Sequence, residues 1–452
     1  MQNFLEWLNS VVWGMPLVIL ICGLGIFLSF KTDFVQLRLF PKAIKMFFAQ
    51  LKKGEKEGGE ITPYRALCTA LAATAGTGNL AGVAGAIAIG GPGVIFWMWV
   101  SALLGMAIKF AEASLAVKFR IKTEEGSYAG GTMHMIERGL GKNWRFLAYL
   151  YCVFGAIASF GIGNATQINT VVIGIDSISE MLGVENGFLI RIGLAVIIAI
   201  LVAISLSGGA VRIGGVAEQL VPAASVCYLL LSFAVLALNA SNIPQAFSVI
   251  VKGAFSPRAV TCGMISSFFA TLRIGVSRGV FTNEAGMGTA GIAHSGSSAS
   301  HPVEQGMMGI VEVFLDTIVI CTMTGLVIIC SGISVPYGVD SGVSLTMDAF
   351  RAVCGQWVVI PLTVSLICFA VATILGWGLY GLRCIEFLLG KKFLKIFVLL
   401  QFVVTIIGAI ANTGAVWLFS DIMNGLMAVP NLIALFLLSP ELLRLISEYT
   451  SA

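Results

Sequence analysis

The chain has 452 residues, of which 58% are hydrophobic and only 11% are charged. A soluble globular domain carries about a quarter charged residues, so this composition excludes a soluble enzyme or binding domain and indicates a polytopic membrane protein. The formal net charge of +4 gives no case for nucleic acid as a partner. The ten cysteines are scattered singly without a C-x-x-C pair, so neither a disulfide framework nor a zinc site is expected.

Windows of about 20 apolar residues predict eleven membrane spans. Lys and Arg concentrate in alternate connections, so the positive-inside rule places the N-terminus outside and the C-terminus in the cytoplasm of a cell-membrane protein. Arg273 and Arg278 are counted on the inner side, and the basic run 52–56 adds contact with anionic membrane lipid. The spans cover approximately 12–30, 62–87, 91–117, 145–172, 188–207, 215–239, 260–280, 305–332, 357–381, 393–411 and 413–438.

Span two contains a helix-breaking sequence at membrane depth. Gly76, Thr77, Gly78 and Asn79 follow one another in an otherwise apolar segment, and each glycine costs a helix about 1 kcal/mol relative to alanine. Close helix packing is the alternative, but it places small residues at helical spacing rather than in a row. Irregular backbone in a membrane is tolerated where it lines a cavity, so we predict a broken helix and a binding site here.

Spans three and four carry polar residues with two different interpretations. Lys109 and Glu112 lie three residues apart near the predicted inner end of span three, which is the spacing of a pair on a helix surface. Asn164 and Gln167 lie one turn apart in the apolar sequence of span four. We expect the first pair to lie on the helix surface, whereas the second places two amide side chains inside a membrane span.

Span seven is broken repeatedly by glycine, and we predict a second helix break between Thr271 and Gly275. Leaving out span one, the remaining ten spans then divide into two sets of five, each opened by a broken helix. An odd number of spans inverts the second set relative to the first, and paired broken helices in inverted repeats indicate a secondary transporter. The expected units are 1–61, with the extra helix and a basic linker, the repeats 62–240 and 241–438, and a cytoplasmic tail, 439–452.

Three sequence blocks together resemble the alanine or glycine:cation symporter family. They are GTGNLAGVA at 76–84 followed by AIGGPGVIFWMW at 88–99, RGVFTNEAGMG at 278–288, and TILGW at 373–377 followed by Tyr380 and Gly381. The resemblance extends from about residue 63 to residue 390. It implies an all-α fold with a leucine-transporter-type core of ten helices, plus one extra N-terminal helix. It also implies import of small neutral amino acids, such as alanine or glycine, coupled to sodium, and no enzymatic activity.

The resemblance allows roles to be assigned to residues. A carboxylate in the membrane suits the free N–H groups and positive helix end at Thr77, Gly78 and Asn79. The substrate ammonium suits carbonyls from Ala270 to Gly275 of the second broken helix, with the hydroxyl of Thr373. By resemblance, Gln167, Thr373 and Trp377 line the substrate pocket, and Trp377 limits its volume.

The expected coupling ion is sodium, a hard cation that prefers oxygen ligands. Our candidate ligands are Thr74 and Thr373, with the backbone carbonyls of Ala75 and Gly78. The family commonly has a hydroxyl residue directly before the threonine, where this chain has Ala372. It also usually has a tyrosine and a glutamate where this chain has Leu379 and Leu382.

Proton coupling or amino-acid exchange is the alternative, because Glu312 and Asp316 in span eight could relay protons. We expect these two carboxylates instead to pair with Arg273 or Arg278. His294 falls in a predicted flexible polar link, 294–301, and has no expected function. A channel and an intramembrane enzyme are disfavoured, because the polar residues cluster at mid-depth and no catalytic motif occurs.

Overall fold

The computed structural model describes residues 2–52, 61–123, 126–184, 187–257, 261, 267–339, 342–411 and 414–451. Within these ranges the chain is almost entirely helical, with one antiparallel pair of two-residue strands. The predicted all-α class is therefore confirmed. All of the basic run 52–56 except Lys52, and most of the first part of predicted span seven, lie outside the described residues.

The elements follow in chain order, with η marking short π- and 3-10 helices. They are α1 (Gln2–Val12), α2 (Met15–Lys31), α3 (Val35–Arg38), α4 (Phe40–Lys52), α5 (Pro63–Thr74), η1 (Gly78–Gly82), α6 (Val83–Gly90), α7 (Val94–Lys118), β1 (Ile121–Lys122), β2 (Tyr128–Ala129), α8 (Thr132–His134), η2 (Met135–Leu140), η3 (Lys142–Trp144), α9 (Arg145–Phe160), η4 (Gly161–Ala165), α10 (Thr166–Leu182), α11 (Gly187–Ser207), α12 (Gly209–Leu238), η5 (Ala240–Asn242), α13 (Ile243–Phe255), α15 (Phe268–Asn283), α16 (Ala290–Ser295), α17 (Pro302–Val313), η6 (Phe314–Cys321), α18 (Thr322–Cys330), α19 (Gly342–Cys354), η7 (Gln356–Val358), α20 (Val359–Leu389), η8 (Lys391–Phe393), α21 (Leu394–Ile410), α22 (Gly414–Leu437) and α23 (Ser439–Ser451).

Nine continuous helical segments in the described part of the chain are long and apolar enough to cross a membrane. A tenth consists of α5 with η1 and α6, which are bent by 50° at the break between them. The protein is therefore a multi-pass membrane protein. An eleventh span would be formed by α15 together with α16, so the predicted number of eleven stays a prediction.

The helix break predicted in span two is confirmed. Thr62 caps the start of α5 by accepting a hydrogen bond from the Arg65 N–H at 3.1 Å. The helix ends at Thr74, and Ala75 leaves the helical conformation with ψ of 79°. The chain resumes its helical path at Gly78. The break is thus a local unwinding at the residues that favour helix least.

The break predicted between Thr271 and Gly275 is wrong. Helix α15 runs without interruption from Phe268 to Asn283, and the chain unwinds afterwards, at Glu284, Gly286 and Gly288, which all have positive φ. Gly275 instead lies against Val94 and Trp97 of α7, where an added Cβ would stand 2.6 Å from the neighbouring atoms. The glycines inside α15 thus permit close helix packing. The later glycines permit the left-handed backbone.

This later break changes the position of two arginines. Arg273 and Arg278 precede it, in the half of α15 that begins beside α13. They therefore lie at the same end of the helix bundle as α13, whereas the positive-inside count placed them at the opposite, inner end. The excess of Lys and Arg in the other connections still favours the orientation that the sequence predicts.

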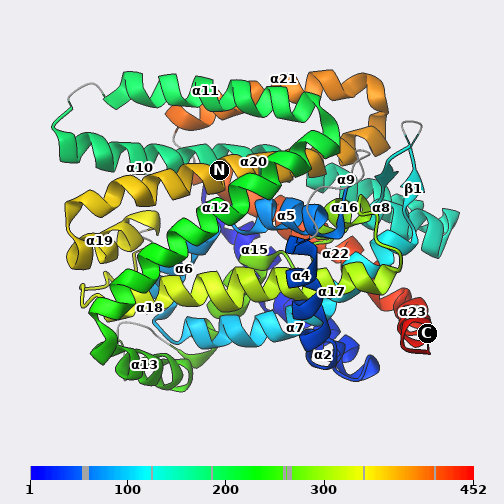
Figure 1. Ribbon diagram of the computed structural model, residues 1–452, viewed down its shortest axis with the longest axis horizontal. Coiled ribbons are helices and arrows are strands. Elements are labelled where there is room, and N and C mark those ends of the chain that lie inside the picture. Colours follow the sequence, from blue (N-terminus) through cyan, green and yellow to red (C-terminus); the bar gives the residue numbers. More distant parts are fainter. Residues whose placement is uncertain are drawn as a thin grey trace.

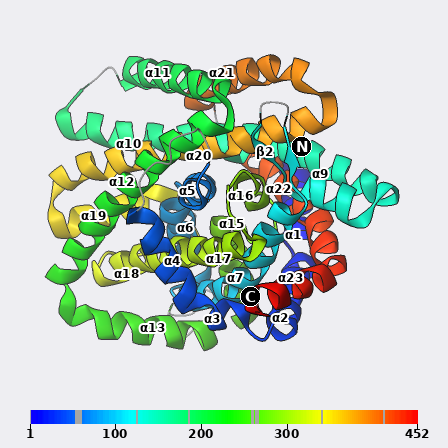
Figure 2. The same cartoon turned by 45° about the vertical axis from the view of Figure 1, so that its right-hand side comes forward.

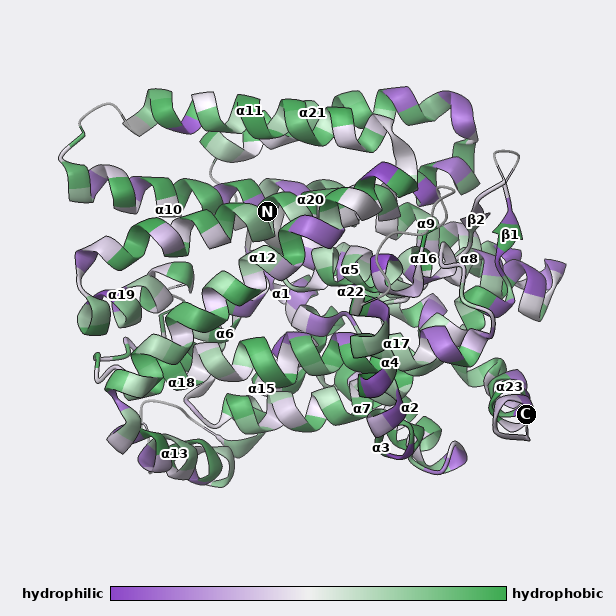
Figure 3. Ribbon diagram, viewed as in Figure 1, coloured by the Kyte–Doolittle hydropathy of each residue, from purple (hydrophilic) through white to green (hydrophobic). Residues whose placement is uncertain are grey.

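The helices form layers around the two unwound segments. In Figure 1, α11 and α21 lie side by side along the upper edge, above α10 and α20, whereas α7 and α17 lie side by side in the lower half. Figure 2 shows α5, α15 and α16 near the centre, enclosed by the other helices. Figure 3 shows mainly hydrophobic residues along the long helices and hydrophilic residues gathered near β1 and β2. This distribution suits a protein whose broken helices lie inside a membrane bundle.

Candidate functional site

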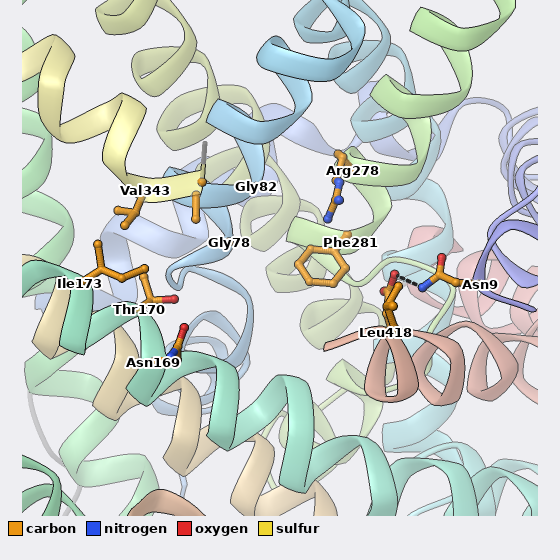
Figure 4. A pocket seen from close by; sticks show the side chains of 13 residues that line it. Asn9, Gly78, Gly82, Asn169, Thr170, Ile173, Arg278, Phe281, Val343 and Leu418 are labelled. Carbon is orange, nitrogen blue, oxygen red and sulfur yellow. Dashed lines mark hydrogen bonds between the residues drawn. The ribbon is translucent and has the colours of Figure 1, made fainter. Parts of the chain in front are cut away.

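A cavity of about 460 Å³ reaches the break between α5 and η1. Figure 4 shows Arg278 and Phe281 of α15 across this cavity from Ile173 and Val343. The walls come from elements that are distant in sequence, including α1, η1, α10, α15, α19 and α22. The lining residues are Asn9, Gly78, Ala81, Gly82, Asn169, Thr170, Ile173, Arg278, Phe281, Gly342, Val343, Leu418 and Asp421.

Gly78 brings the unwound backbone to the cavity wall. The N–H groups of Thr77 and Gly78 make no backbone hydrogen bond among the described residues, whereas the N–H of Asn79 donates to the Gly76 carbonyl at 3.2 Å. A Cβ added at Gly78 would lie 3.5 Å from the Phe281 ring. Unpaired N–H groups at the start of a helix attract anions because the helix dipole is positive there.

Thr77, Gln167 and Thr373 lie together directly behind this wall. The Thr77 hydroxyl donates to Gln167 Oε1 at 2.7 Å, and the Gln167 amide donates to the Ile162 carbonyl at 2.9 Å. The Thr373 hydroxyl lies against the backbone of Gly76 and is buried without a hydrogen-bond partner in the described part of the chain. The structure thus joins these three predicted residues, with Gln167 holding Thr77 in position.

Asn79 points away from that group, toward η6. Its amide nitrogen donates to Asp316 Oδ1 at 2.7 Å, and its amide oxygen accepts from the Gly76 N–H at 2.9 Å. The side chain therefore ties both ends of the break to a buried carboxylate. Asn79 supports the site from behind and does not line the cavity.

Two predicted site residues lie outside this arrangement. Trp377 is fully buried, one turn along α20 from Thr373, and packs against Gly163 and the ring of Tyr380. Gly275 faces α7, as described above, and is not brought to the cavity. Of the predicted residues, Gly78 alone is among those that line the cavity.

Sequence reasoning missed the residues around the cavity mouth. Asp421 of α22 accepts a hydrogen bond from Asn9 at 2.9 Å, and its backbone carbonyl accepts one from Trp13 at 2.9 Å. The Arg278 guanidinium lies over the Phe281 ring at 5.6 Å. Arg278 and Phe281 belong to the block at 278–288, so that block was a usable signal. Nothing in the sequence pattern links Asn9 with Asp421.

The intramembrane charges are paired differently from what the sequence suggested. Lys109 and Glu112 are fully buried and do not form a surface pair, because Lys109 pairs with Glu312 at 3.1 Å. Glu112 accepts hydrogen bonds from the N–H groups of Gly286 and Gly288, at 2.9 and 3.0 Å, and so holds the unwound segment after α15.

The expected pairing of Glu312 and Asp316 with Arg273 or Arg278 is also wrong. Glu312 contacts Lys109 and His294, and Asp316 contacts Asn79 and Thr317. His294 lies in α16 with no exposed surface, so the segment that begins with it is not a flexible link. Several groups of hydrogen-bonded, buried polar residues thus gather near the two breaks.

Comparison with known proteins gives the family. The model of the sodium:alanine symporter family matches residues 1–452. The chain belongs to this family. It is 41% identical over 438 residues to the sodium/alanine symporter AgcS of Methanococcus maripaludis, covering 95% of this chain and 93% of that protein. It is 34% identical over 455 residues to the amino-acid carrier protein AlsT of Bacillus subtilis, covering 99% and 93%.

Membership makes the protein a transporter and not an enzyme, and it supports amino acid:cation symport. Among solved structures, the crystal structure of MhsT in complex with L-phenylalanine is similar, with a TM-score of 0.56 over 83% of this chain and 88% of that one. The sequence identity is 15%, so this likeness concerns the fold. It agrees with the fold that the family resemblance implied.

Proposed function

We propose that the protein imports a small neutral amino acid, alanine or glycine, together with sodium by alternating access. The observation that carries the proposal is the unwound segment after α5, where the N–H groups of Thr77 and Gly78 lack backbone partners among the described residues and Gly78 lines the cavity. A substrate carboxylate would satisfy both donors at the positive end of η1 and α6. The names of the relatives AgcS and AlsT support an amino acid as the substrate.

The short distance across the cavity at Gly78 favours a small substrate. An added Cβ there would already contact Phe281 at 3.5 Å, so the backbone is accessible because residue 78 has no side chain. We propose that Thr77, Gln167 and Thr373 complete the site when the cavity closes, with Trp377 limiting the substrate side chain. Gly275 keeps only a packing function in this proposal.

The residues expected to bind sodium are suited to a cation. Thr373 offers a buried hydroxyl that has no hydrogen-bond partner among the residues that the structure describes. The carbonyl of Ala75 is turned out of the helix direction. The Thr74 hydroxyl, in the last turn of α5, donates to the Ala70 carbonyl at 3.3 Å and keeps its oxygen lone pairs as acceptors. Hydroxyl and carbonyl oxygens are the ligands that a hard cation prefers. In this proposal sodium is a cosubstrate. The backbone carbonyl of Gly78 is a further ligand of the ion.

We further propose a membrane arrangement that follows the sequence prediction. The protein lies in the cell membrane with its N-terminus outside and its C-terminal helix α23 in the cytoplasm. Eleven spans result when α15 and α16 count as one, and units 62–240 and 241–438 form the inverted repeats. The two unwound segments, after α5 and after α15, support this division, because each repeat then begins with a broken helix.

A proton-coupled symporter or exchanger is the second candidate. It is favoured by the bond between Asn79 and Asp316, because that carboxylate is buried and directly linked to the unwound segment. Protonation of a carboxylate inside a membrane protein can be coupled to substrate movement. In this alternative, Asp316 carries the coupling proton.

The decisive experiment measures uptake of labelled alanine into proteoliposomes that contain the purified protein. An inward sodium gradient should drive accumulation, while an inward proton gradient without sodium should not. Glycine should compete with alanine, and a large neutral amino acid such as phenylalanine should not. Accumulation that follows the proton gradient alone would favour the second candidate.

A further inference from the structure

Helix α19 packs against the unwound segment although its 13 residues are too few to cross a membrane. It contacts η1 and α6 on one side, and α10, α12, α18 and α20 around it. The hydroxyl of Thr346 in α19 donates a hydrogen bond to the Leu80 carbonyl of η1 at 3.1 Å. Both residues are fully buried. None of the site residues that the sequence predicted takes part in this bond.

We propose that Thr346 is a positioning residue of the substrate site, because it holds α19 on η1 and so fixes the Gly78 backbone. This role depends on the proposed function, since it assumes that the substrate carboxylate binds at Gly78. Thr346 is not among the residues that line the cavity, so it acts through Leu80 and not by contact with the substrate.

Hydrogen bonds from three different elements hold η1 and the residue before it. Thr77 is held by α10 and Asn79 by η6, through the bonds described above. The bond from Thr346 is the third, and it acts on a backbone carbonyl, that of Leu80. Gly78 has no side chain of its own, so the direction of its N–H group follows from the residues on either side. Loss of one of the three bonds should therefore alter the carboxylate site.

The Leu80 carbonyl has a second donor, the Val83 N–H within the same turn. A carbonyl oxygen has two lone pairs and can accept both bonds. Removal of the Thr346 hydroxyl therefore leaves this carbonyl with one partner. We expect a variant without the hydroxyl to fold, with η1 held less closely to α19.

Helix α19 is itself anchored to two long helices. The Phe350 ring lies 5.9 Å from the Tyr228 ring of α12. The Ser177 hydroxyl of α10 donates to the Met347 sulfur at 3.6 Å. A binding site is held precisely when the residues that support it are themselves fixed by packing. Thr346 thus ties η1 to α10 and α12 through α19.

Val343 links the same helix to the cavity wall. It precedes Thr346 by three residues, so the two side chains lie on one face of α19. Val343 is buried and lines the cavity, and Figure 4 shows it near Gly82 and Ile173. Movement of α19 away from η1 would therefore separate this wall from the Gly78 backbone. For both reasons, alanine affinity should depend on Thr346.

The first test measures the Kd for alanine, from the increase in thermal stability of the purified protein, and the KM and kcat of alanine uptake. Thr346→Val keeps the shape of threonine but cannot donate. We expect Kd and KM to rise about threefold to tenfold, within the range for loss of one hydrogen bond. The kcat should stay within about twofold, because the contact supports binding throughout. Thr346→Ser restores the hydroxyl and should restore both constants.

Thr363→Val is the matched control. The Thr363 hydroxyl is buried and donates to the Gly174 carbonyl of α10 at 3.4 Å, and neither residue lines the cavity. This variant also loses a bond between a threonine and a helix carbonyl, but its Kd and KM for alanine should not change. An equal rise in both variants would show general destabilisation and overturn the role of Thr346. Wild-type affinity in Thr346→Val, or no recovery in Thr346→Ser, would overturn it as well.

The second test does not require alanine binding. Hydrogen exchange of the backbone amides at 77–83 is compared between the wild type and Thr346→Val without alanine. Exchange should be faster in the variant and return to the wild-type rate in Thr346→Ser. Equal rates in the wild type and Thr346→Val would show that the hydroxyl does not hold η1. If alanine does not stabilise the wild type, the proposed function fails instead, and exchange at 77–83 then decides on Thr346.

Discussion

Asn79 and Asp316 join the unwound segment after α5 to η6 through a hydrogen bond of 2.7 Å. The same carboxylate accepts the Thr317 hydroxyl at 2.8 Å through its other oxygen. The Asn79 side chain also accepts a hydrogen bond from the Gly76 N–H. The conformation of the break therefore depends on Asp316, which is more than 200 residues away in sequence. The binding segment is therefore preorganised by the second half of the chain.

Asp316→Asn should retain sodium-driven alanine uptake within about fivefold of the wild type, since an asparagine oxygen can accept from Asn79 while the Thr317 hydroxyl turns to accept. Asp316→Leu removes both acceptors and leaves a buried amide unpaired, at about 1–3 kcal/mol. It should lose most uptake. Initial rates in proteoliposomes with matched protein content test both variants. Loss of coupling in Asp316→Asn, with wild-type transport following the proton gradient, would support the proton-coupled alternative.

Gly78→Val should abolish uptake, because two methyl groups beyond a Cβ that already contacts Phe281 would cover the unwound backbone. Gly82→Val is the matched control. It lines the same cavity one turn later, where an added Cβ meets no atom within 4 Å, so it should keep at least about a third of the wild-type rate. Alanine uptake, and the increase in thermal stability when alanine is added, are measured for both variants. Near-normal alanine binding by Gly78→Val would contradict a carboxylate site at this backbone.

Much of the architecture could be predicted from sequence because the signals are local. Long apolar windows predict membrane helices, and three consecutive weak helix formers at 76–78 predict a break where the structure has one. The second break was misplaced because glycine serves two purposes. Gly275 permits a close approach to α7, whereas Gly286 and Gly288 adopt positive φ, and composition does not distinguish these roles.

The site was only partly predictable for a related reason. Thr77, Gln167 and Thr373 could be named because the family resemblance assigned them to the site, whereas Asn9 and Asp421 meet Arg278 at the cavity only through tertiary packing. The partner of Lys109 was likewise missed, because Glu112 is near in sequence and Glu312 is near in space. Charge pairs inside a helix bundle follow the packing and not the helical spacing.

Trp377→Ala should relax selection toward larger neutral amino acids, because the lost indole leaves space in the closed pocket beside Thr373. The side chain is fully buried, so the variant should also lose about 3–5 kcal/mol of stability. Competition of unlabelled amino acids against labelled alanine measures the selectivity, and thermal unfolding measures the stability. A destabilised variant with an unchanged competition profile would show that Trp377 serves packing alone.

Thr373→Val tests the sodium site, because valine keeps the shape of threonine but removes the hydroxyl, which has no partner within the described ranges. Half-maximal uptake should then require at least about tenfold more sodium, with the amino-acid preference retained, since a hard cation binds less well as oxygen ligands are removed. Ala372→Ser restores a hydroxyl at the preceding position and should lower the sodium requirement. Uptake at fixed alanine over a sodium series measures both effects.

The two substitutions must shift the sodium requirement in opposite directions for the assignment to hold. If Thr373→Val weakens alanine affinity and leaves the sodium response unchanged, the hydroxyl serves the substrate ammonium. If neither variant changes the sodium response, the cation does not bind beside Ala75 and Thr373. Because valine cannot donate or accept a hydrogen bond, Thr373→Ser is the control that separates the hydroxyl from the methyl group, and it should restore the wild-type sodium response.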